Sequence, residues 1–182
     1  MRAPRKFKFN ADKFREAIVY IASRSERDPY FGAVKLNKAL YFSDFAAYRR
    51  LGKPITGATY QNLAEGPAPR QMLPIRNEMI REGQVTLESR AYFNTVQQRI
   101  VPWRSPDVSH FSPAELAIVD EILEATSTLS ARAVSDLSHL EMGWRLTQPG
   151  DTIPYESAWL SSGPLPQEAQ EYAREVSERR GR

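Results

Sequence analysis

The sequence predicts an α+β domain that is mainly α-helical: a compact helical body with one small β-hairpin. Three observations lead to this prediction. Apolar residues recur at helical spacing in several segments, the pattern switches to period two between residues 84 and 101, and glycine or proline separates the segments. The length of 182 residues suits a single domain.

The N-terminal part of the chain predicts two helices joined by a loop. Asn10 is a good N-cap residue, and an apolar stripe follows it at helical spacing: Phe14, Ala17, Ile18 and Ile21. Residues 25–29 break the pattern. A second helix is expected from about Ala33 to Leu51, and its apolar character over most of its circumference predicts a central position. Gly52 and Pro54 end it.

The middle of the chain predicts an extended segment, a third helix and a hairpin. Residues 56–63 are rich in Thr and Tyr, which favours a strand or an extended segment. The third helix is expected between Pro67 and Glu82, where Pro74 either begins the regular helix or kinks it. Residues 84–101 are expected to form two antiparallel strands that turn between Arg90 and Asn94.

The last part of the chain predicts further helices. A Ser-Pro-x-Glu motif at residues 112–115 is typical of a capping box with proline at the first helical position. A short helix is expected from Ser130 to about Met142, with Gly143 stopping it. A strongly charged helix is expected from Gln167 to about Glu178.

We divide the chain into a basic arm (1–9), a folded domain (10–160) and a charged C-terminal extension (161–182). The net charge of +3 hides an asymmetry, because residues 1–111 carry 19 Lys/Arg against 10 Asp/Glu, whereas residues 112–156 carry 2 against 8. A basic first part favours an acidic partner or nucleic acid, but an ordinary solvated mixed-charge surface explains the same counts.

The sequence contains none of the common catalytic or metal-binding motifs that we considered. The chain has no cysteine, and a zinc site would require His110, His139 and two carboxylates, for which the spacing gives no support. Neither a glycine-rich phosphate loop nor a G-x-S-x-G or S-x-x-K motif is present. We therefore expect no enzyme activity, no metal and no cofactor.

The N-terminus does not look like a signal peptide. Residues 1–9 are basic, and residues 10–23 are amphipathic rather than continuously apolar. No stretch approaches the roughly 20 apolar residues that cross a bilayer. Together with the absence of cysteine, these features predict a cytoplasmic protein.

The order of helices and hairpin across residues 33–101 also permits a winged-helix-like arrangement in the central part. A third helix carrying Arg70, Arg76 and Arg81 would then meet DNA, with the hairpin as the wing. The same helix carries Glu78 and Glu82 and lacks a continuous basic face. A DNA-binding regulator is therefore the alternative function.

A series of motifs runs along the chain in a distinctive order. It contains KLNKALYFSD at residues 35–44, GKPITGATY at 52–60 and EGP at 65–67, and continues with LSH at 137–139, Trp144 and IPYES at 153–157. Together, over about residues 10–160, these motifs resemble the Panacea domain of SocA-like antitoxins. The sequence departs from the family pattern at Pro74 and at residues 141–143, where the family often has an acidic residue and a proline before the tryptophan.

The resemblance implies a mainly helical α+β domain that neutralises a toxin encoded nearby by direct protein–protein binding. It also implies a bacterial source and a setting in phage defence, with family members paired to many unrelated toxins. Masking of the toxin and its delivery to a protease both remain open, as do the oligomeric state and any regulation of the operon.

The motif residues are expected mostly to hold the scaffold, because family signature residues need not touch the toxin. Gly57 and Gly66 are expected to adopt backbone conformations closed to other residues. Tyr41 and Tyr60 are expected to be buried with their hydroxyls hydrogen-bonded. The full set is Lys35, Leu36, Tyr41, Asp44, Gly57, Tyr60, Gly66, Pro67, Ser138, His139, Trp144, Pro154 and Tyr155.

Partner contact is expected to involve exposed aromatic residues and arginines, which dominate interface energetics. The partner-binding candidates are Tyr30, Arg49, Arg50, Tyr92, Trp103 and Trp159. Phe31 and Phe93 are also aromatic candidates, but for these two and for Trp159 the sequence permits a core position equally well.

Overall fold

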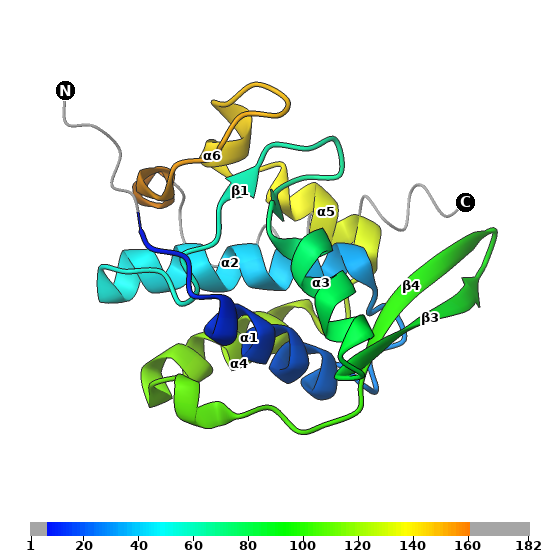
Figure 1. Ribbon diagram of the computed structural model, residues 1–182. Coiled ribbons are helices and arrows are strands. Elements are labelled where there is room, and N and C mark those ends of the chain that lie inside the picture. The colour runs from blue at the N-terminus through cyan, green and yellow to red at the C-terminus, as the bar shows by residue number, and fades with distance from the viewer. Residues whose placement is uncertain (1–6, 161–182) are drawn as a thin grey trace.

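The computed structural model describes residues 7–160 and has a helical body from which one hairpin projects (Figure 1). Its helices are α1 (Ala11–Arg24), α2 (Ala33–Leu51), α3 (Met72–Arg81), α4 (Pro113–Thr126), α5 (Ala131–Ser138) and α6 (Met142–Arg145). Two short 3₁₀ helices, η1 (Val108–His110) and η2 (Tyr155–Trp159), complete the described helices. The mainly α-helical α+β prediction is confirmed. The expected helix at 167–178 lies outside the described residues.

The described strands form two small antiparallel sheets. β1 (Tyr60–Gln61) pairs with β2 (Ala68–Pro69), and β3 (Val85–Tyr92) pairs with β4 (Thr95–Pro102). The predicted hairpin is confirmed, with a two-residue turn at Phe93 and Asn94. The segment expected to be extended over 56–63 forms a strand only at residues 60–61.

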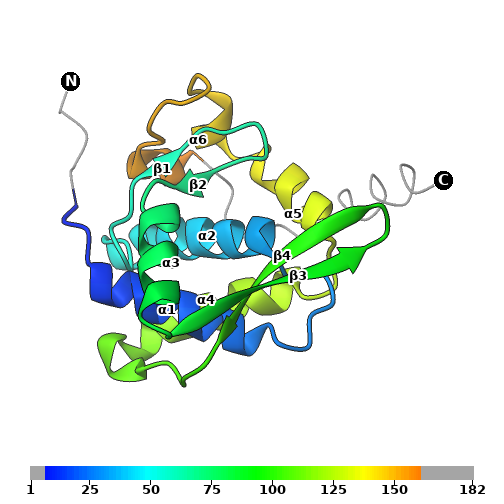
Figure 2. The same cartoon turned by 45° about the vertical axis from the view of Figure 1, so that its right-hand side comes forward.

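The helix α2 runs through the middle of the molecule (Figure 2). It packs against α1, α4, α5, η2, β2 and β4. Thirteen of its residues are buried, and they include charged residues as well as apolar ones. Gly52 ends the helix in the left-handed conformation, and its N–H donates to the Tyr48 carbonyl at 2.9 Å. The predicted bounds and central position of this helix are confirmed.

Local capping fixes the starts of two helices that lie beside α2. The Asn10 side chain accepts a hydrogen bond from the Lys13 N–H at 2.9 Å, which begins α1. Ser112 and Glu115 form the predicted capping box of α4. Lys13 also forms an ion pair with Glu115 at 2.7 Å, so the two capped ends are joined.

The third helix lies within the predicted range between Pro67 and Glu82. α3 begins at Met72, because residues 68–69 pair with β1, and Pro74 lies in its first turn, where proline is tolerated, rather than kinking the helix. The helix expected over 130–142 is two helices, separated at residues 139–141. Gly143 does not stop a helix but lies inside α6.

Gly143 allows α6 to approach η2 closely. A Cβ atom at this position would lie 2.3 Å from Ser157 Oγ and 2.6 Å from Ile153 Cγ2. Neither distance is tolerable for unbonded heavy atoms, so a side chain at position 143 would push α6 away from η2.

We predict that Gly143→Ala lowers the free energy of unfolding by about 1–3 kcal/mol through this overlap. Urea denaturation measures the loss. In the double variant Gly143→Ala/Ser157→Ala the nearest clashing atom is absent, so the effect of the alanine at 143 should be smaller than in the wild-type background. An equal loss in both backgrounds would contradict the close-packing explanation.

Candidate partner-binding surface

The β3–β4 hairpin forms an arm that projects from the helical body (Figures 1 and 2). Its root packs against α1, α2 and α3, and there Val85 and Ile100 are buried. Towards the tip, residues 89–96 are exposed except for the half-buried Tyr92. The arm therefore presents the side chains of its outer half to solvent.

Arg99 of β4 fastens the arm to the body. Its guanidinium donates to the carbonyl oxygens of Ser25, Glu26 and Asp28 at 2.6–2.8 Å and to that of Phe31 at 3.4 Å. The side chain is 4% exposed, and its burial, with a second arginine nearby, lowers the pKa of the guanidinium. Because these carbonyls follow the C-terminus of α1, the cation also meets the negative end of the helix dipole.

A shallow groove of about 230 Å³ lies beside the arm, between the tip half of the hairpin and the start of α2. Tyr30 and Tyr92 meet in it edge to face, with ring centroids 6.0 Å apart. Its lining side chains within residues 7–160 are uncharged: Tyr30, Ala33, Val34, Tyr92, Thr95, Val96, Gln97, Gln98 and Ala131, with Gly32 adding backbone. Such a groove is suited to an apolar side chain of a partner.

Phe93 stands at the tip of the arm. It is 91% exposed, and its φ of 48° lies in the left-handed region, which is unfavourable for an aromatic residue. Its ring packs edge to face on Tyr92, with centroids 4.9 Å apart. The hairpin therefore holds a large apolar ring in solvent at a backbone position better suited to glycine.

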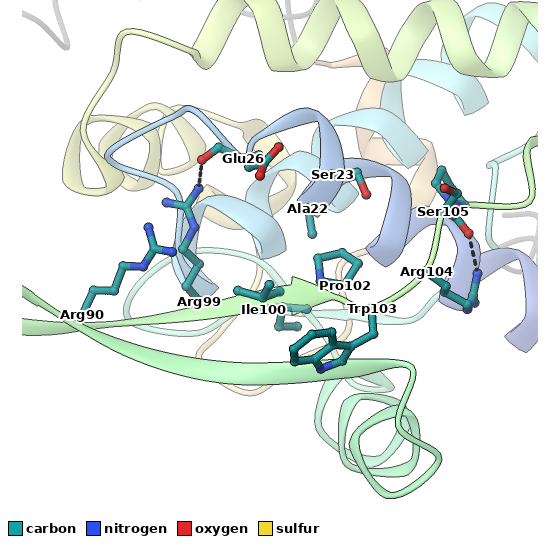
Figure 3. A pocket seen from close by; sticks show the side chains of 12 residues that line it. Ala22, Ser23, Glu26, Arg90, Arg99, Ile100, Pro102, Trp103, Arg104 and Ser105 are labelled. Atoms are coloured by element: carbon teal, nitrogen blue, oxygen red, sulfur yellow. Dashed lines mark hydrogen bonds between the residues drawn. The ribbon is translucent and has the colours of Figure 1, made fainter.

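A second hollow, of about 450 Å³, lies at the root of the arm between β4 and α1. In Figure 3 the Trp103 ring forms one wall, and Arg90, Arg99 and Arg104 lie around the rim. Arg104 is paired with Glu16 at 2.6 Å, and the Arg99 donors are taken by carbonyls. The positive charges of this hollow are therefore largely balanced by the protein itself.

The structure separates the predicted partner-binding residues into three places. Tyr30 and Tyr92 meet at the groove, whereas Trp103 lies at the hairpin root. Arg49, Arg50 and Trp159 lie at the other end of α2, which spans about 28 Å for its 19 residues. Arg50 pairs there with Glu121 at 2.6 Å. Phe31 is a core residue, 1% exposed.

The third helix has no continuous basic face in the structure. Glu78 and Glu82 form ion pairs with Arg15 of α1 at 2.5 and 2.7 Å. The exposed side of α3 carries Leu73 and Ile80. Asn77 and Arg81 are also exposed on this helix, so its surface mixes apolar and hydrogen-bonding side chains and does not present a basic face.

Several motif residues meet at the buried carboxylate of Asp44. It accepts hydrogen bonds from the Thr56 N–H at 2.7 Å, the Thr56 hydroxyl at 2.5 Å and the Tyr60 hydroxyl at 2.8 Å. Burial raises the pKa of Asp44, and these hydrogen bonds oppose the rise. Tyr155 donates to the Ala58 carbonyl at 2.6 Å beside them. The cluster joins α2 to the 56–60 segment and to η2.

The two motif tyrosines Tyr41 and Tyr60 are both buried, as expected, but only one has the expected hydrogen bond. The Tyr60 hydroxyl donates to Asp44, whereas the Tyr41 hydroxyl has no hydrogen-bond partner among residues 7–160. The ring of Tyr41 packs against Phe45, with centroids 4.2 Å apart. The expectation was therefore wrong for Tyr41, because ring packing within α2 fixes its position and no acceptor lies within reach.

Two buried lysines of α2 have different surroundings. Lys35 forms an ion pair with Asp28 and donates to the carbonyls of Thr126 and Leu129 at 2.8 and 2.9 Å. Lys38 donates to the Pro67 carbonyl at 3.0 Å, and burial lowers its pKa to about 8. The Lys35 charge therefore has a carboxylate in direct contact, whereas Lys38 contacts a neutral acceptor.

Ser138 and His139 lie against the 64–67 loop rather than in an open site. Ser138 is fully buried, and its hydroxyl donates to the Ser135 carbonyl at 2.6 Å. Gly66, with a φ of 89°, leaves room for this hydroxyl, since a Cβ atom at 66 would lie 2.2 Å from it. His139 stacks on Trp144 with centroids 4.1 Å apart, and burial lowers its pKa. This arrangement holds α5 and α6 to the loop.

The remaining motif residues also contact the scaffold. Leu36 is a core residue, 1% exposed, and Gly57 has a φ of 70° where its backbone passes the carbonyl of Lys8. The Trp144 indole N–H donates to the Leu63 carbonyl at 3.0 Å, and Pro154 precedes the first residue of η2. These positions fit the expectation that the motifs mostly hold the fold.

Within residues 7–160, no group of three or more His, Asp or Glu side chains is placed to hold a metal ion. Nor does any helix there combine the length and apolar character needed to span a membrane.

The sequence prediction missed Arg99, Val34 and Gln97. Gln97 lines the groove and donates to the Pro29 carbonyl at 3.2 Å. The period-two pattern of the strands could have identified part of this surface. If the turn is placed at residues 93–94, then residues 95, 97 and 99 lie on the same face of the hairpin as Tyr92. The sequence did not define the turn type, so that face was not identified.

A comparison with protein families gives one relevant result. The family model described as "Antitoxin SocA-like, Panacea domain" matches residues 36–145, which is more than half of the chain. Comparison with curated proteins and with solved structures gives no match.

We predict that Lys38→Met stabilises the protein at pH 7. The pKa of Lys38 is about 8 in the folded protein and 10.5 in the unfolded chain. Below pH 8 the buried charge therefore lowers the free energy of unfolding by about 3 kcal/mol. Between pH 8 and 10.5 the unfolded chain binds more protons, so wild-type stability rises relative to the variant. Allowing for the lost hydrogen bond to Pro67, Lys38→Met should be about 1–2 kcal/mol more stable at pH 7.

Urea denaturation at pH 7 and pH 10 measures this difference. At pH 10 the folded Lys38 is neutral, so the advantage should fall by about 2.5 kcal/mol and Lys38→Met should become slightly less stable than the wild type. Lys35→Met is the matched control, because it leaves Asp28 and two carbonyls without their buried cation and should destabilise the protein at both values. If Lys38→Met destabilised the protein as much as Lys35→Met at pH 7, the assigned cost of the Lys38 charge would be wrong.

Proposed function

Because the chain belongs to the family of SocA-like antitoxins with a Panacea domain, we propose that it neutralises a protein toxin by binding it directly, without catalysis. The tip of the β3–β4 arm at Phe93 and the Tyr30–Tyr92 groove form the contact surface in this proposal. The family name supports the antitoxin role, and the shape and chemistry of the arm support the location.

The observation that carries the location is the exposed aromatic tip beside an uncharged groove. Phe93 projects its ring into solvent, and the groove beside it exposes Tyr30, Tyr92 and Val96. Anchor residues of interfaces are commonly aromatic and enter partner pockets, while grooves accept apolar side chains of the partner. An arm with both features can insert an aromatic ring into a pocket of the toxin and accept an apolar side chain of the toxin in its groove.

The attachment of the arm favours masking over delivery to a protease. Arg99 holds the root to four main-chain carbonyls, so the arm needs little ordering when it binds. A preformed surface loses less conformational entropy on association, which favours a long-lived stoichiometric complex. Masking requires such a complex. If the protein acts by masking, it should still protect cells from the growth arrest caused by the toxin when those cells lack the protease.

We predict that Phe93→Gly separates binding from folding. Glycine accepts a positive φ without strain, so the stability of the antitoxin should be unchanged or slightly raised. Loss of the aromatic anchor should weaken toxin binding by about tenfold to a hundredfold. The measurement is affinity co-purification with the protein encoded by the neighbouring gene, coupled to a growth assay in which that neighbour is induced alone or with the antitoxin.

The matched control is Trp159→Ala, which removes a ring that is also largely exposed (62%) but lies at the opposite end of α2. This variant should retain binding and growth rescue. The opposite outcome would be full growth rescue by Phe93→Gly and no rescue by Trp159→Ala. It would indicate that the toxin binds at the end of α2 near Trp159 and not at the arm. A neighbour that is neither toxic nor bound would contradict the antitoxin proposal for that gene pair.

A further inference from the structure

The outer edge of β3 has unpaired main-chain groups at alternate residues. Across the hairpin Tyr92 is opposite Thr95 at the two-residue turn, and the Trp103 N–H donates to the Gln84 carbonyl at 3.0 Å. Both pairs belong to the hydrogen-bonded set of an antiparallel ladder, which contains the even-numbered residues of β3. The N–H and C=O groups of Leu87, Ser89 and Ala91 therefore point away from β4.

This edge is open over its outer half. Ser89 and Ala91 are exposed, and Leu87 is half-buried. Among residues 7–160, no backbone hydrogen bond from outside the hairpin reaches these three residues. β4 lies on the side of the arm that packs against α1 and α2, so the free edge belongs to β3.

Natural proteins usually protect such an edge with proline or with charges that repel another strand. β3 (Val85–Tyr92) contains no proline. Its two charged residues, Glu88 and Arg90, have opposite signs. They form an ion pair at 3.0 Å along the same strand. The edge therefore has no net charge to repel a copy of itself.

Charge complementarity selects one register for a second copy. Only registers that place odd-numbered residues opposite odd-numbered ones can form the new hydrogen bonds. Centring the two-fold axis on position 88 or 90 would set Glu88 against Glu88, or Arg90 against Arg90. Centring it on Ser89 instead places Glu88 of each copy opposite Arg90 of the other, and Leu87 opposite Ala91.

We infer that two copies of this chain pair through the outer edges of β3, antiparallel about a two-fold axis at Ser89, to form one four-stranded sheet. The order of strands is β4-β3-β3-β4, and the interface is isologous. Roughly six main-chain hydrogen bonds and two pairs of opposite charges hold it. Such a short interface is weak and reversible, so the dimer population rises with protein concentration.

The dimer does not depend on the proposed toxin surface. The paired residues 87–91 are not among those that line the Tyr30–Tyr92 groove, and Phe93 lies beyond them at the tip. Toxin binding can fail while dimerisation stands, and the reverse also holds. The oligomeric state is therefore measured on the full chain alone.

Sedimentation equilibrium over a range from low micromolar to near-millimolar protein measures the association. The mass should rise from 20.7 kDa towards twice that value. Arg90→Glu and Glu88→Arg each set like charges opposite one another in both halves of the interface, and each should weaken the dimer about tenfold or more. The double variant E88R/R90E restores opposite charges and should restore the dimer.

An equimolar mixture of the two single variants should form a heterodimer. The Glu88→Arg chain carries positive charges at both positions, and they face the two negative charges of the Arg90→Glu chain. Ser89→Pro removes an outward N–H without taking a bond from the hairpin, so it should abolish association and leave the circular dichroism spectrum unchanged. This variant keeps the test independent of any effect of the charge reversals on folding.

Three results would overturn the proposal. One is a mass of 20.7 kDa at every concentration. Another is association that Ser89→Pro and both single reversals leave unchanged. The third is a monomeric antitoxin in which Ser89→Pro abolishes toxin co-purification, since the β3 edge would then bind a strand of the toxin rather than a second copy.

Discussion

The helix α2 is buried on nearly every side, and its buried charged residues must therefore find partners inside the protein. A buried charge or carboxylate without a partner costs several kcal/mol, so each such residue of α2 constrains a segment outside the helix. Lys35 binds the end of α4 through the Thr126 and Leu129 carbonyls, and Asp44 binds the 56–60 segment. Lys38 reaches the carbonyl of Pro67. Several of these partners are main-chain atoms, so the helix fixes the path of the backbone in the loops that it contacts.

This constraint explains why some elements follow from the sequence and others do not. α2, the capping box of α4 and the β3–β4 hairpin depend on periodicity and capping within a few residues, which the sequence displays directly. The start of α3 depends on pairing between residues 60–61 and 68–69, and the position of Gly143 depends on contact with η2. Such contacts join segments that are apart in sequence, so local patterns do not contain them.

In the candidate surface, too, the sequence identifies single residues but not the contacts between residues that are far apart in the chain. Tyr30 and Tyr92 are identifiable as aromatic residues in a loop and near a predicted turn, but their meeting is not. It requires the hairpin to lie over the loop between α1 and α2, a position fixed by Arg99. In the sequence Arg99 is one arginine in a strand of alternating character, and nothing nearby shows that its partners are carbonyls about 70 residues earlier. Arg49, Arg50 and Trp159 have equally suitable chemistry, yet they lie at the far end of α2.

The way the arm is attached separates stability from recognition. Arg99 binds main-chain carbonyls, and the hairpin itself is held by its own ladder and by a buried root that includes Val85 and Ile100. None of these contacts requires a particular side chain at the tip or on the exposed rim of the groove. Substitution of Phe93 or Val96 therefore changes the exposed surface of the arm without removing what holds it in place. Buried α2 residues fix the scaffold and main-chain atoms fix the arm, so the exposed side chains of the arm can vary while the fold is retained.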